Sequence, residues 1–195
     1  MPKRTVKNDY ILSRNTLAII TRDHQDCRSL ILEQYYQEMK SLDAPVTILN
    51  RTCILYGADF EGRRKYAQHI LKTDKKIPVS IIPQHGVFMF PTAATTNRNC
   101  VWLSYYRISN YQMHNDFQTL VTFDEGSLLI VDIPAKSFQR QYNLTGQLVA
   151  QSLKGIVLPD FGTCPFLTVQ NNHFYNSAVI DQIDERKERI LKLQP

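Results

Sequence analysis

The sequence predicts an α+β fold in which helices flank an antiparallel sheet of short strands. Apolar residues recur at helical spacing in residues 44–73 and again in residues 136–154. Between them, from residue 77, the pattern changes to short β-branched or aromatic runs separated by Pro, Asn and Gly. With 195 residues, 43% of them hydrophobic, the chain is long enough to bury a core without metals or disulfides.

The N-terminal part predicts strands. Two β-favouring runs lie within residues 10–22, on either side of Arg14-Asn15, and predict a hairpin. Residues 28–33 predict a further strand.

Two helices are predicted next. Residues 44–56 follow a capping Asp43 and carry Pro45 near the start, and Gly57 ends this helix. A second helix is predicted over residues 59–73. Its apolar residues face inward, whereas its basic residues lie outward or flank that face: Arg63, Arg64, Lys65 and Lys72.

Short strands follow along the middle of the chain. The predicted runs are residues 77–82, 87–90, 101–108, 117–123 and 127–133. The segment Phe123–Ser127 is the strongest turn signal because its Gly126 can adopt a positive φ, so the last two strands are predicted to form a hairpin.

The C-terminal part is predicted to be helical with one interruption. Residues 136–154 form a helix, residues 155–176 form a loop with one strand, and residues 176–193 form an amphipathic helix. We therefore predict one domain over residues 1–155 and a C-terminal helical appendage over residues 156–195. The appendage helix carries an apolar stripe that favours self-association, with packing against its own sheet as the alternative.

Motifs for catalysis and for metal or cofactor binding are not found. Residues 57–62 have the G-x-x-x-x-G frame of a phosphate loop, but Arg63 and Arg64 stand where that loop needs Lys and a hydroxyl residue. The five histidines lie at no metal-ligand spacing. The sequence predicts neither an enzyme nor a cofactor.

Cellular location is inferred from the cysteines and the apolar runs. Cys27, Cys53, Cys100 and Cys164 form no C-x-x-C pair and are read as thiols of a reducing cytosol. The longest apolar runs have four residues, far short of the roughly 20 that a membrane span needs. We expect a cytoplasmic protein with no membrane partner.

Positive charge is concentrated in one segment. Residues 51–110 hold nine Lys or Arg against three Asp or Glu, and the net charge of the whole chain is +5. Such a field favours a polyanion such as nucleic acid or an anionic membrane surface. A solvated helix face with a chance surplus of cations is the alternative.

A basic and aromatic set of residues stands out as a candidate DNA-binding site. Cations neutralise phosphates, and planar side chains stack on bases. Trp102 is expected in the core, because Trp is highly buried on average. The predicted DNA-binding residues are Arg63, Arg64, Lys65, Lys72, Lys75, Lys76, Arg98, Tyr105 and Arg107.

A series of short motifs runs through residues 49–141: Asn50–Cys53, Tyr56-Gly57, Gly62–Arg64, Lys76–Val79, Phe88–Thr92, Asn99–Ser104, Val121–Phe123 with Gly126, and Ser137-Phe138 with Gln141. Their order and spacing resemble the competence transcription factor ComK family. The resemblance implies a DNA-binding activator of competence (DNA-uptake) genes that binds A/T-rich tracts of double-stranded DNA, largely through the minor groove, as a multimer. It also implies regulation by adaptor-directed proteolysis.

Two other classes of function compete with that of a DNA-binding activator. One is a non-enzymatic regulatory module that binds a protein partner without direct DNA binding. The other is an enzyme acting on nucleic acid, which would need a cluster of acids for metal. Residues 51–110 offer only Asp59, Glu61 and Asp74 for that purpose.

Overall fold

The structure is a computed structural model that describes residues 5–6, 8–24, 26–35 and 37–157. The chain divides into two units, Met1–Val157 and Leu158–Pro195. The second unit lies outside the described residues, and so do the loop, the strand and the amphipathic helix predicted beyond Val157.

The described residues form ten strands, three α-helices and two 3-10 turns. In chain order these are β1 (Thr5–Val6), β2 (Thr16–His24), β3 (Cys27–Glu33), β4 (Gln37–Ser41), α1 (Pro45–Leu55), α2 (Phe60–Leu71), β5 (Val79–Ile82), η1 (Pro83–His85), β6 (Val87–Pro91), β7 (Val101–Ser104), η2 (Tyr105–Arg107), β8 (Ile108–Asn115), β9 (Gln118–Phe123), β10 (Leu128–Val131) and α3 (Ala135–Val157).

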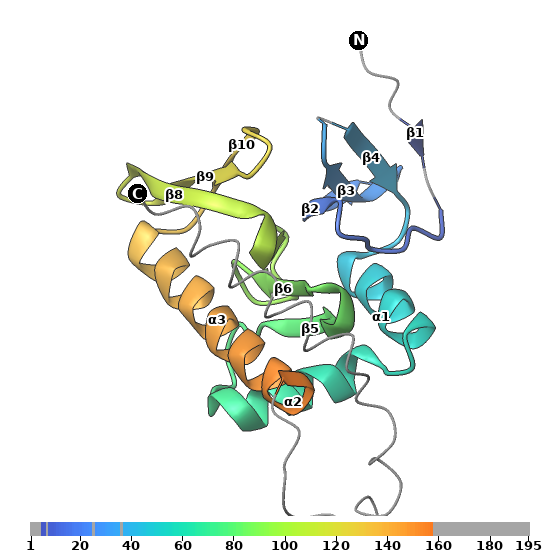
Figure 1. Cartoon of the computed structure of the whole chain (residues 1–195). Helices are drawn as coiled ribbons and strands as arrows, with labels where there is room; N and C mark the ends of the chain where they lie inside the picture. Colours follow the sequence, from blue (N-terminus) through green and yellow to red (C-terminus); the bar gives the residue numbers. More distant parts are fainter. Residues whose placement is uncertain (1–4, 7, 25, 36, 158–195) are drawn as a thin grey trace, which may run out of the picture. The chain divides into compact units, whose positions relative to one another are not determined.

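Seven of the strands form one sheet and three form another (Figure 1). The larger sheet has the order β1-β4-β3-β2-β7-β6-β5, and every pair in it is antiparallel except β1 with β4. β2 lies at its centre, where Ile19 is opposite Ile31 on one side and Trp102 on the other. The smaller sheet has the order β10-β9-β8 and is wholly antiparallel.

Helices α1 and α2 cover one face of the large sheet. The core there joins sheet residues such as Ile19 and Trp102 to Ile48 and Leu49 of α1. Phe60 at the start of α2 meets the Trp102 ring edge-on, with ring centroids 5.8 Å apart. Trp102 is 1% exposed, which confirms the prediction that it is a core residue.

The small sheet and α3 cover the opposite face. Phe90 and Leu103 of the large sheet pack there with Val121 of β9 and Phe138 of α3. A third cluster joins the C-terminal parts of α2 and α3, where Ala67 and Leu71 pack with Leu148, Val149 and Leu153. The two helices are therefore in contact at these ends (Figure 1).

The predicted fold class is confirmed. The three helices begin and end within three residues of the predicted bounds. β9 and β10 form the predicted hairpin, in which Gly126 has a φ of 93°. The predicted strands at residues 28–33, 77–82 and 87–90 correspond to β3, β5 and β6.

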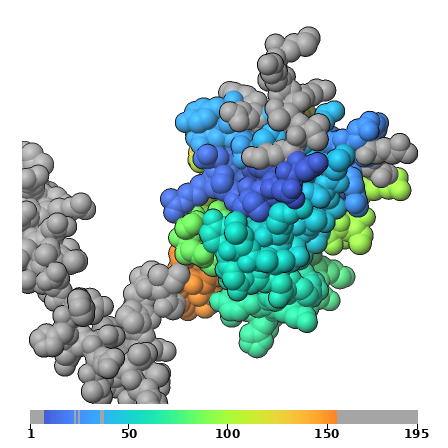
Figure 2. Space-filling view, turned by 90° about the vertical axis from the view of Figure 1, so that its right-hand side faces the viewer, coloured from blue at the N-terminus to red at the C-terminus, as the bar shows by residue number. Residues whose placement is uncertain are grey.

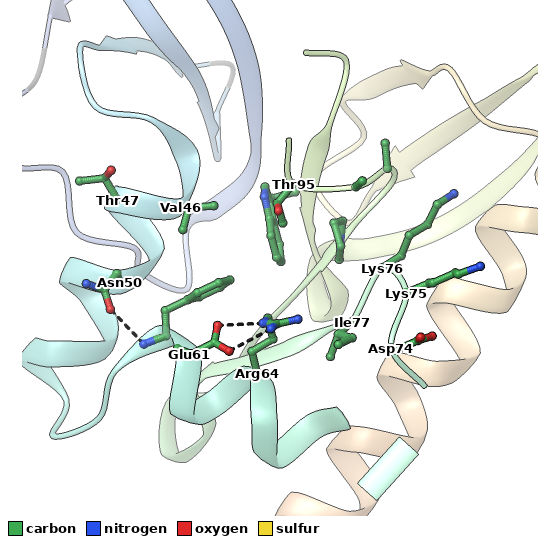
Figure 3. A pocket seen from close by; sticks show the side chains of 15 residues that line it. Val46, Thr47, Asn50, Glu61, Arg64, Asp74, Lys75, Lys76, Ile77 and Thr95 are labelled. Carbon is green, nitrogen blue, oxygen red and sulfur yellow. Dashed lines mark hydrogen bonds and ion pairs between the residues drawn. The ribbon is translucent and has the colours of Figure 1, made fainter. Parts of the chain in front are cut away.

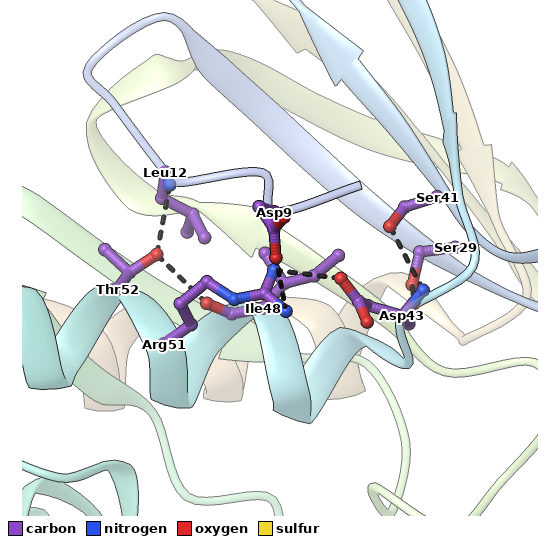
Figure 4. A network of polar contacts seen from close by, with 8 residues as sticks. All are labelled: Asp9, Leu12, Ser29, Ser41, Asp43, Ile48, Arg51 and Thr52. Atoms are coloured by element: carbon purple, nitrogen blue, oxygen red, sulfur yellow. Dashed lines mark hydrogen bonds and ion pairs between the residues drawn. The ribbon is translucent and has the colours of Figure 1, made fainter. Parts of the chain in front are cut away.

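The hairpin predicted within residues 10–22 is wrong. Only β2 forms there, because the residues before it are bonded to other elements. The Leu12 amide donates to the Thr52 hydroxyl of α1, at 3.0 Å (Figure 4). The buried Tyr10 hydroxyl donates to the Glu33 carboxylate. Beside them Arg51 forms ion pairs with Asp43 and Asp9. Strands β1 and β4 were not predicted.

The strand predicted over residues 101–108 is also wrong at its C-terminal end. β7 stops at Ser104, and Tyr105–Arg107 form the turn η2. A new strand, β8, then starts at Ile108 in the other sheet. The alternation that would place Tyr105 and Arg107 on one face of a strand therefore does not apply.

Along the described ranges, no helix combines the length and the apolar character needed to cross a membrane. Three of the four cysteines, Cys27, Cys53 and Cys100, are buried free thiols.

Candidate nucleic-acid interface

Several of the predicted basic residues meet at one open groove. The groove has a volume of about 890 Å³ and lies between α1, α2, the segment before β5 and the loop after β6 (Figure 3). Arg64, Lys75 and Lys76 line it, together with Glu61 and Asp74. Its apolar lining includes the ring atoms of Phe60 and Trp102, both of which are core residues.

Two local hydrogen bonds fix the corner between α1 and α2. Asp59 caps α2, because its carboxylate accepts from the Gly62 amide at 2.6 Å. Asn50 of α1 accepts from the Phe60 amide at 3.0 Å (Figure 3). Figure 2 shows the face that these two helices make, in cyan and teal. The basic side chains of α2 therefore start from a rigid backbone.

Arg64 is tied to an acid on its own helix. Its Nε and Nη2 atoms both donate to the carboxylate of Glu61, each at 2.9 Å. This bond raises the pKa of Arg64 and lowers the pKa of Glu61. Glu61 is exposed, so the pair adds little stability, but it offsets much of the charge that Arg64 brings to the groove.

Four lysines in this region are outside the ion pairs of the described chain: Lys75 and Lys76 line the groove, whereas Lys65 on α2 and Lys72 at its C-terminal end do not. Among the described residues, no acid forms an ion pair with Lys65, Lys72, Lys75 or Lys76. Lys75 and Lys76 extend in the same direction at the edge of the groove (Figure 3). Lys72 and Lys76 each have a φ of 50°, so the short segment between α2 and β5 is held in a left-handed conformation at both ends.

Arg63 differs from its neighbours because it points inward. It is half-buried, and its Nε atom is enclosed with no hydrogen-bond partner among the described residues. Burial raises the pKa of the nearby Cys53 to about 11, and the charge of Arg63 acts in the opposite direction. The charge of Arg63 is therefore directed toward the buried side of α2 rather than toward a ligand in the solvent.

Arg98 lies on the exposed loop between β6 and β7. Ala93, Ala94 and Thr95 of the same loop line the groove. Asn97 accepts from the Asn99 amide at 2.8 Å and so shapes the turn that carries Arg98.

Tyr105 and Arg107 are not part of the groove. Arg107 is only 16% exposed and forms an ion pair with Asp124 at 2.9 Å. The Tyr105 ring packs on Tyr142 of α3, at a centroid distance of 4.6 Å. Burial raises the pKa of Tyr142, and its contact with Tyr105 adds to this. In this structure the Tyr105 and Arg107 side chains both contact elements that neighbour η2.

A second polar surface, on α3, was missed by the sequence analysis. The helix has no Asp or Glu from Ala135 to Val157. Its exposed side carries three cations and four amides at helical spacing: Lys136, Gln139, Arg140, Asn143, Gln147, Gln151 and Lys154. The signal that would have revealed this surface is the absence of acidic residues over the 23 residues of α3.

The arrangement of cations suits the binding of a polyanion. Cations on a rigid scaffold attract phosphates and need no chemistry of their own. Within residues 5–157, as far as they are described, no group of three or more His, Cys, Asp or Glu side chains is placed to hold a metal ion.

Comparisons with known proteins identify the family of the chain. The family model for the ComK protein matches residues 7–155. The chain is also 27% identical, over 143 residues, to the competence transcription factor of Bacillus subtilis (strain 168), which covers 71% of this chain and 72% of that protein. No solved structure matches. Because the family model spans three quarters of the sequence, including both polar surfaces, the chain belongs to the ComK protein family.

Proposed function

We propose that this chain, which its family makes a transcriptional regulator of competence, activates DNA-uptake genes by binding double-stranded DNA. The observation that carries the proposal is the family match over residues 7–155, which contains Lys65, Lys72, Lys75 and Lys76 and the acid-free face of α3. A relative at 27% identity is named a competence transcription factor.

The electrostatics of the groove support contact with phosphates. Within the described part of the chain no acid forms an ion pair with Lys65, Lys72, Lys75 or Lys76, although Glu61 and Asp74 also line the groove, so the four ammonium groups can each contact a phosphate. Each phosphate that a cation neutralises releases a counterion from the DNA, and this makes binding depend steeply on salt.

The finer features of the proposal come from the family resemblance. We propose A/T-rich tracts as the DNA site, because their narrow minor groove has an enhanced negative potential that attracts inserted cations. Arg98, on the exposed loop between β6 and β7, has the charge that such insertion requires. We also propose that the protein acts in the cytoplasm as a multimer, and that adaptor-directed proteolysis limits its amount.

The first experiment measures the salt dependence of DNA binding. Fluorescence anisotropy with an A/T-tract duplex would compare the wild type with a variant that carries Lys65→Ala, Lys75→Ala and Lys76→Ala. If all three lysines contact phosphates, the slope of log K against log salt falls by about three. Arg63 and Arg64 are left in place because one is half-buried and the other is paired with Glu61.

A matched control removes three cations elsewhere. Arg22→Ala, Arg28→Ala and Lys40→Ala act on β2, β3 and β4, away from the groove. The proposal predicts that this control keeps the wild-type slope. Equal losses in both variants would mean that the groove is not the DNA surface. If the wild type binds neither an A/T-rich nor a G/C-rich duplex at low salt, a protein-binding module without DNA binding replaces the proposal.

A further inference from the structure

Strands β8 and β9 form an arm whose free end is exposed. From Ser109 to Asn115 every residue of β8 except the half-buried Tyr111 is exposed. Two large apolar side chains lie at this end, Met113 at 66% exposure and Phe117 at 77%. Large apolar side chains grouped at one exposed end form the kind of patch that marks an interaction site.

The tip of the arm is held in one conformation by its own amides. Asn115 accepts from the Phe117 amide at 2.9 Å, and its side-chain nitrogen donates to Gln118 at 2.7 Å. Gln118 in turn donates to the Asp132 carboxylate at 2.7 Å. The turn that displays Phe117 is therefore preorganised, which lowers the entropy lost when the side chain binds a ligand.

The base of the arm is fixed to α3. Tyr111 of β8 packs on Phe138 and Tyr142, at ring-centroid distances of 4.8 and 5.4 Å. Figure 1 shows the arm beside the N-terminal end of α3. Lys136 and Arg140, exposed in this part of the helix, place positive charge near the base of the arm.

The chemistry of the arm matches a nucleic-acid groove. Between Ile108 and Phe123 the only charged residue is Asp116, with His114 taken as neutral, whereas Asn and Gln are frequent. Amides donate to and accept from base edges, and proteins that bind the minor groove often insert Phe or Met between base steps. An interface between copies of the chain would instead favour a broad apolar centre.

We propose that the β8–β9 arm enters the groove of bound DNA and that Phe117 wedges into a base step, with Met113 beside it. This inference rests on the proposed function, since it needs the protein to bind DNA. Lys136 and Arg140 then contact phosphates next to the wedged step. The wedge unstacks that step and bends the duplex.

The test uses the full chain and an A/T-tract duplex with 2-aminopurine placed at successive positions. This base becomes more fluorescent when it is unstacked, and energy transfer between dyes at the duplex ends reports the bend. Wild-type protein is expected to raise the fluorescence at one step. Phe117→Ser should abolish that rise, reduce the bend and weaken binding about 5- to 150-fold, the range for loss of one base–aromatic stack.

Leu128→Ser is the matched control. Leu128 lies on β10, opposite Thr122 at the far end of β9 from Phe117, is apolar, and is 62% exposed, so the substitution has a similar chemical effect away from the tip of the arm. It should keep the fluorescence rise and the bend. Neither substitution removes a buried side chain, so both variants are expected to fold, which circular dichroism checks.

Three results would overturn the inference. If wild-type protein binds with a steep salt dependence but unstacks no base, the arm proposal fails and the proposed function stands. If Phe117→Ser lowers the molar mass in solution yet leaves the fluorescence rise intact, the arm is an interface between copies. If no duplex binds at all, both proposals fail.

Discussion

Gly146 allows the Tyr105 ring to lie against α3, and this close approach can be tested by adding one methyl group. A Cβ at position 146 would lie 3.0 Å from the Tyr105 hydroxyl oxygen and 3.7 Å from the ring carbon that bears it. The first distance is tighter than most Cβ contacts, so the ring would have to shift by a few tenths of an ångström, whereas the second is ordinary. Tyr142 and Tyr106 pack on the same ring, so it has little room to move.

The expected free energies follow from this geometry. Gly→Ala inside a helix stabilises by about 1 kcal/mol, and overpacking a filled site costs about 1 to 3 kcal/mol. Gly146→Ala alone should therefore be neutral or lower the free energy of unfolding by up to about 2 kcal/mol. In a Tyr105→Phe background the clashing oxygen is gone, and the same change should raise the free energy of unfolding by about 1 kcal/mol.

Urea denaturation of the wild type, the two single variants and the double variant measures this coupling. We expect a coupling energy of about 1 to 3 kcal/mol, and Gln147→Ala on the exposed side of α3 serves as a control that changes stability by less than about 0.5 kcal/mol. If Gly146→Ala stabilises equally in both backgrounds, Tyr105 does not lie against the helix. DNA affinity measured on Tyr105→Phe then decides whether the hydroxyl contacts DNA instead.

Three more predictions concern residues whose burial or contacts the structure describes: Trp102, Arg107 and two of the cysteines. Trp102→Ala should cost about 3 to 5 kcal/mol in urea denaturation; a fully stable variant that has lost only DNA binding would make Trp102 a contact residue. Arg107→Ala and Asp124→Ala should couple by about 0.5 to 1 kcal/mol in a double-mutant cycle and leave the salt slope of DNA binding unchanged; a slope lower by about one would place Arg107 on the DNA. Burial raises the pKa of Cys53 to about 11 and also raises the pKa of Cys100, so iodoacetamide at pH 8.5 should label both thiols, read by peptide mass, only after unfolding. Because the folded state favours the neutral thiol of Cys53, that thiol lowers the free energy of unfolding as pH rises from about 9 to about 11.

The helices could be predicted from the sequence because their signals are local. Pro45 in the first turn and apolar spacing locate α1, and apolar spacing locates α2. The predicted capping role of Asp43 is wrong, because Ala44 is the N-cap of α1 and Asp43 accepts from Arg51 instead. Strand β8 could not be predicted, because nearly all of its residues are exposed. Its sequence therefore lacks the alternation of apolar and polar residues that marks a half-buried strand. The N-terminal segment was misread for a different reason, because Tyr10 and Leu12 satisfy their polar groups through residues more than 20 positions away.

The candidate site could be predicted only in part. The excess of cations in residues 51–110 located Lys65, Lys72, Lys75 and Lys76, but sequence alone does not show that Arg64 is held by Glu61. The α3 surface was missed because residues 111–160 together carry more acids than bases. Those acids lie outside the helix, so the sign of the local charge changes once the helix boundaries are known.

The two polar surfaces are mechanically linked, and this bears on how they would act on one duplex. Leu71 of α2 packs with Leu148, Val149 and Leu153 of α3, and Lys72 and Lys154 directly follow the ends of these contacts. The lysines near the groove and the cations of α3 therefore have fixed relative positions before DNA binds. Because the spacing is fixed beforehand, less conformational entropy is lost when the protein binds DNA. The affinity also depends on whether the distance between the two surfaces matches the distance between phosphates on the duplex. If the protein recognises an A/T tract by its narrow minor groove, it needs this rigidity. Lysines on a flexible scaffold would adapt to the phosphates of any duplex and bind all sequences with similar affinity.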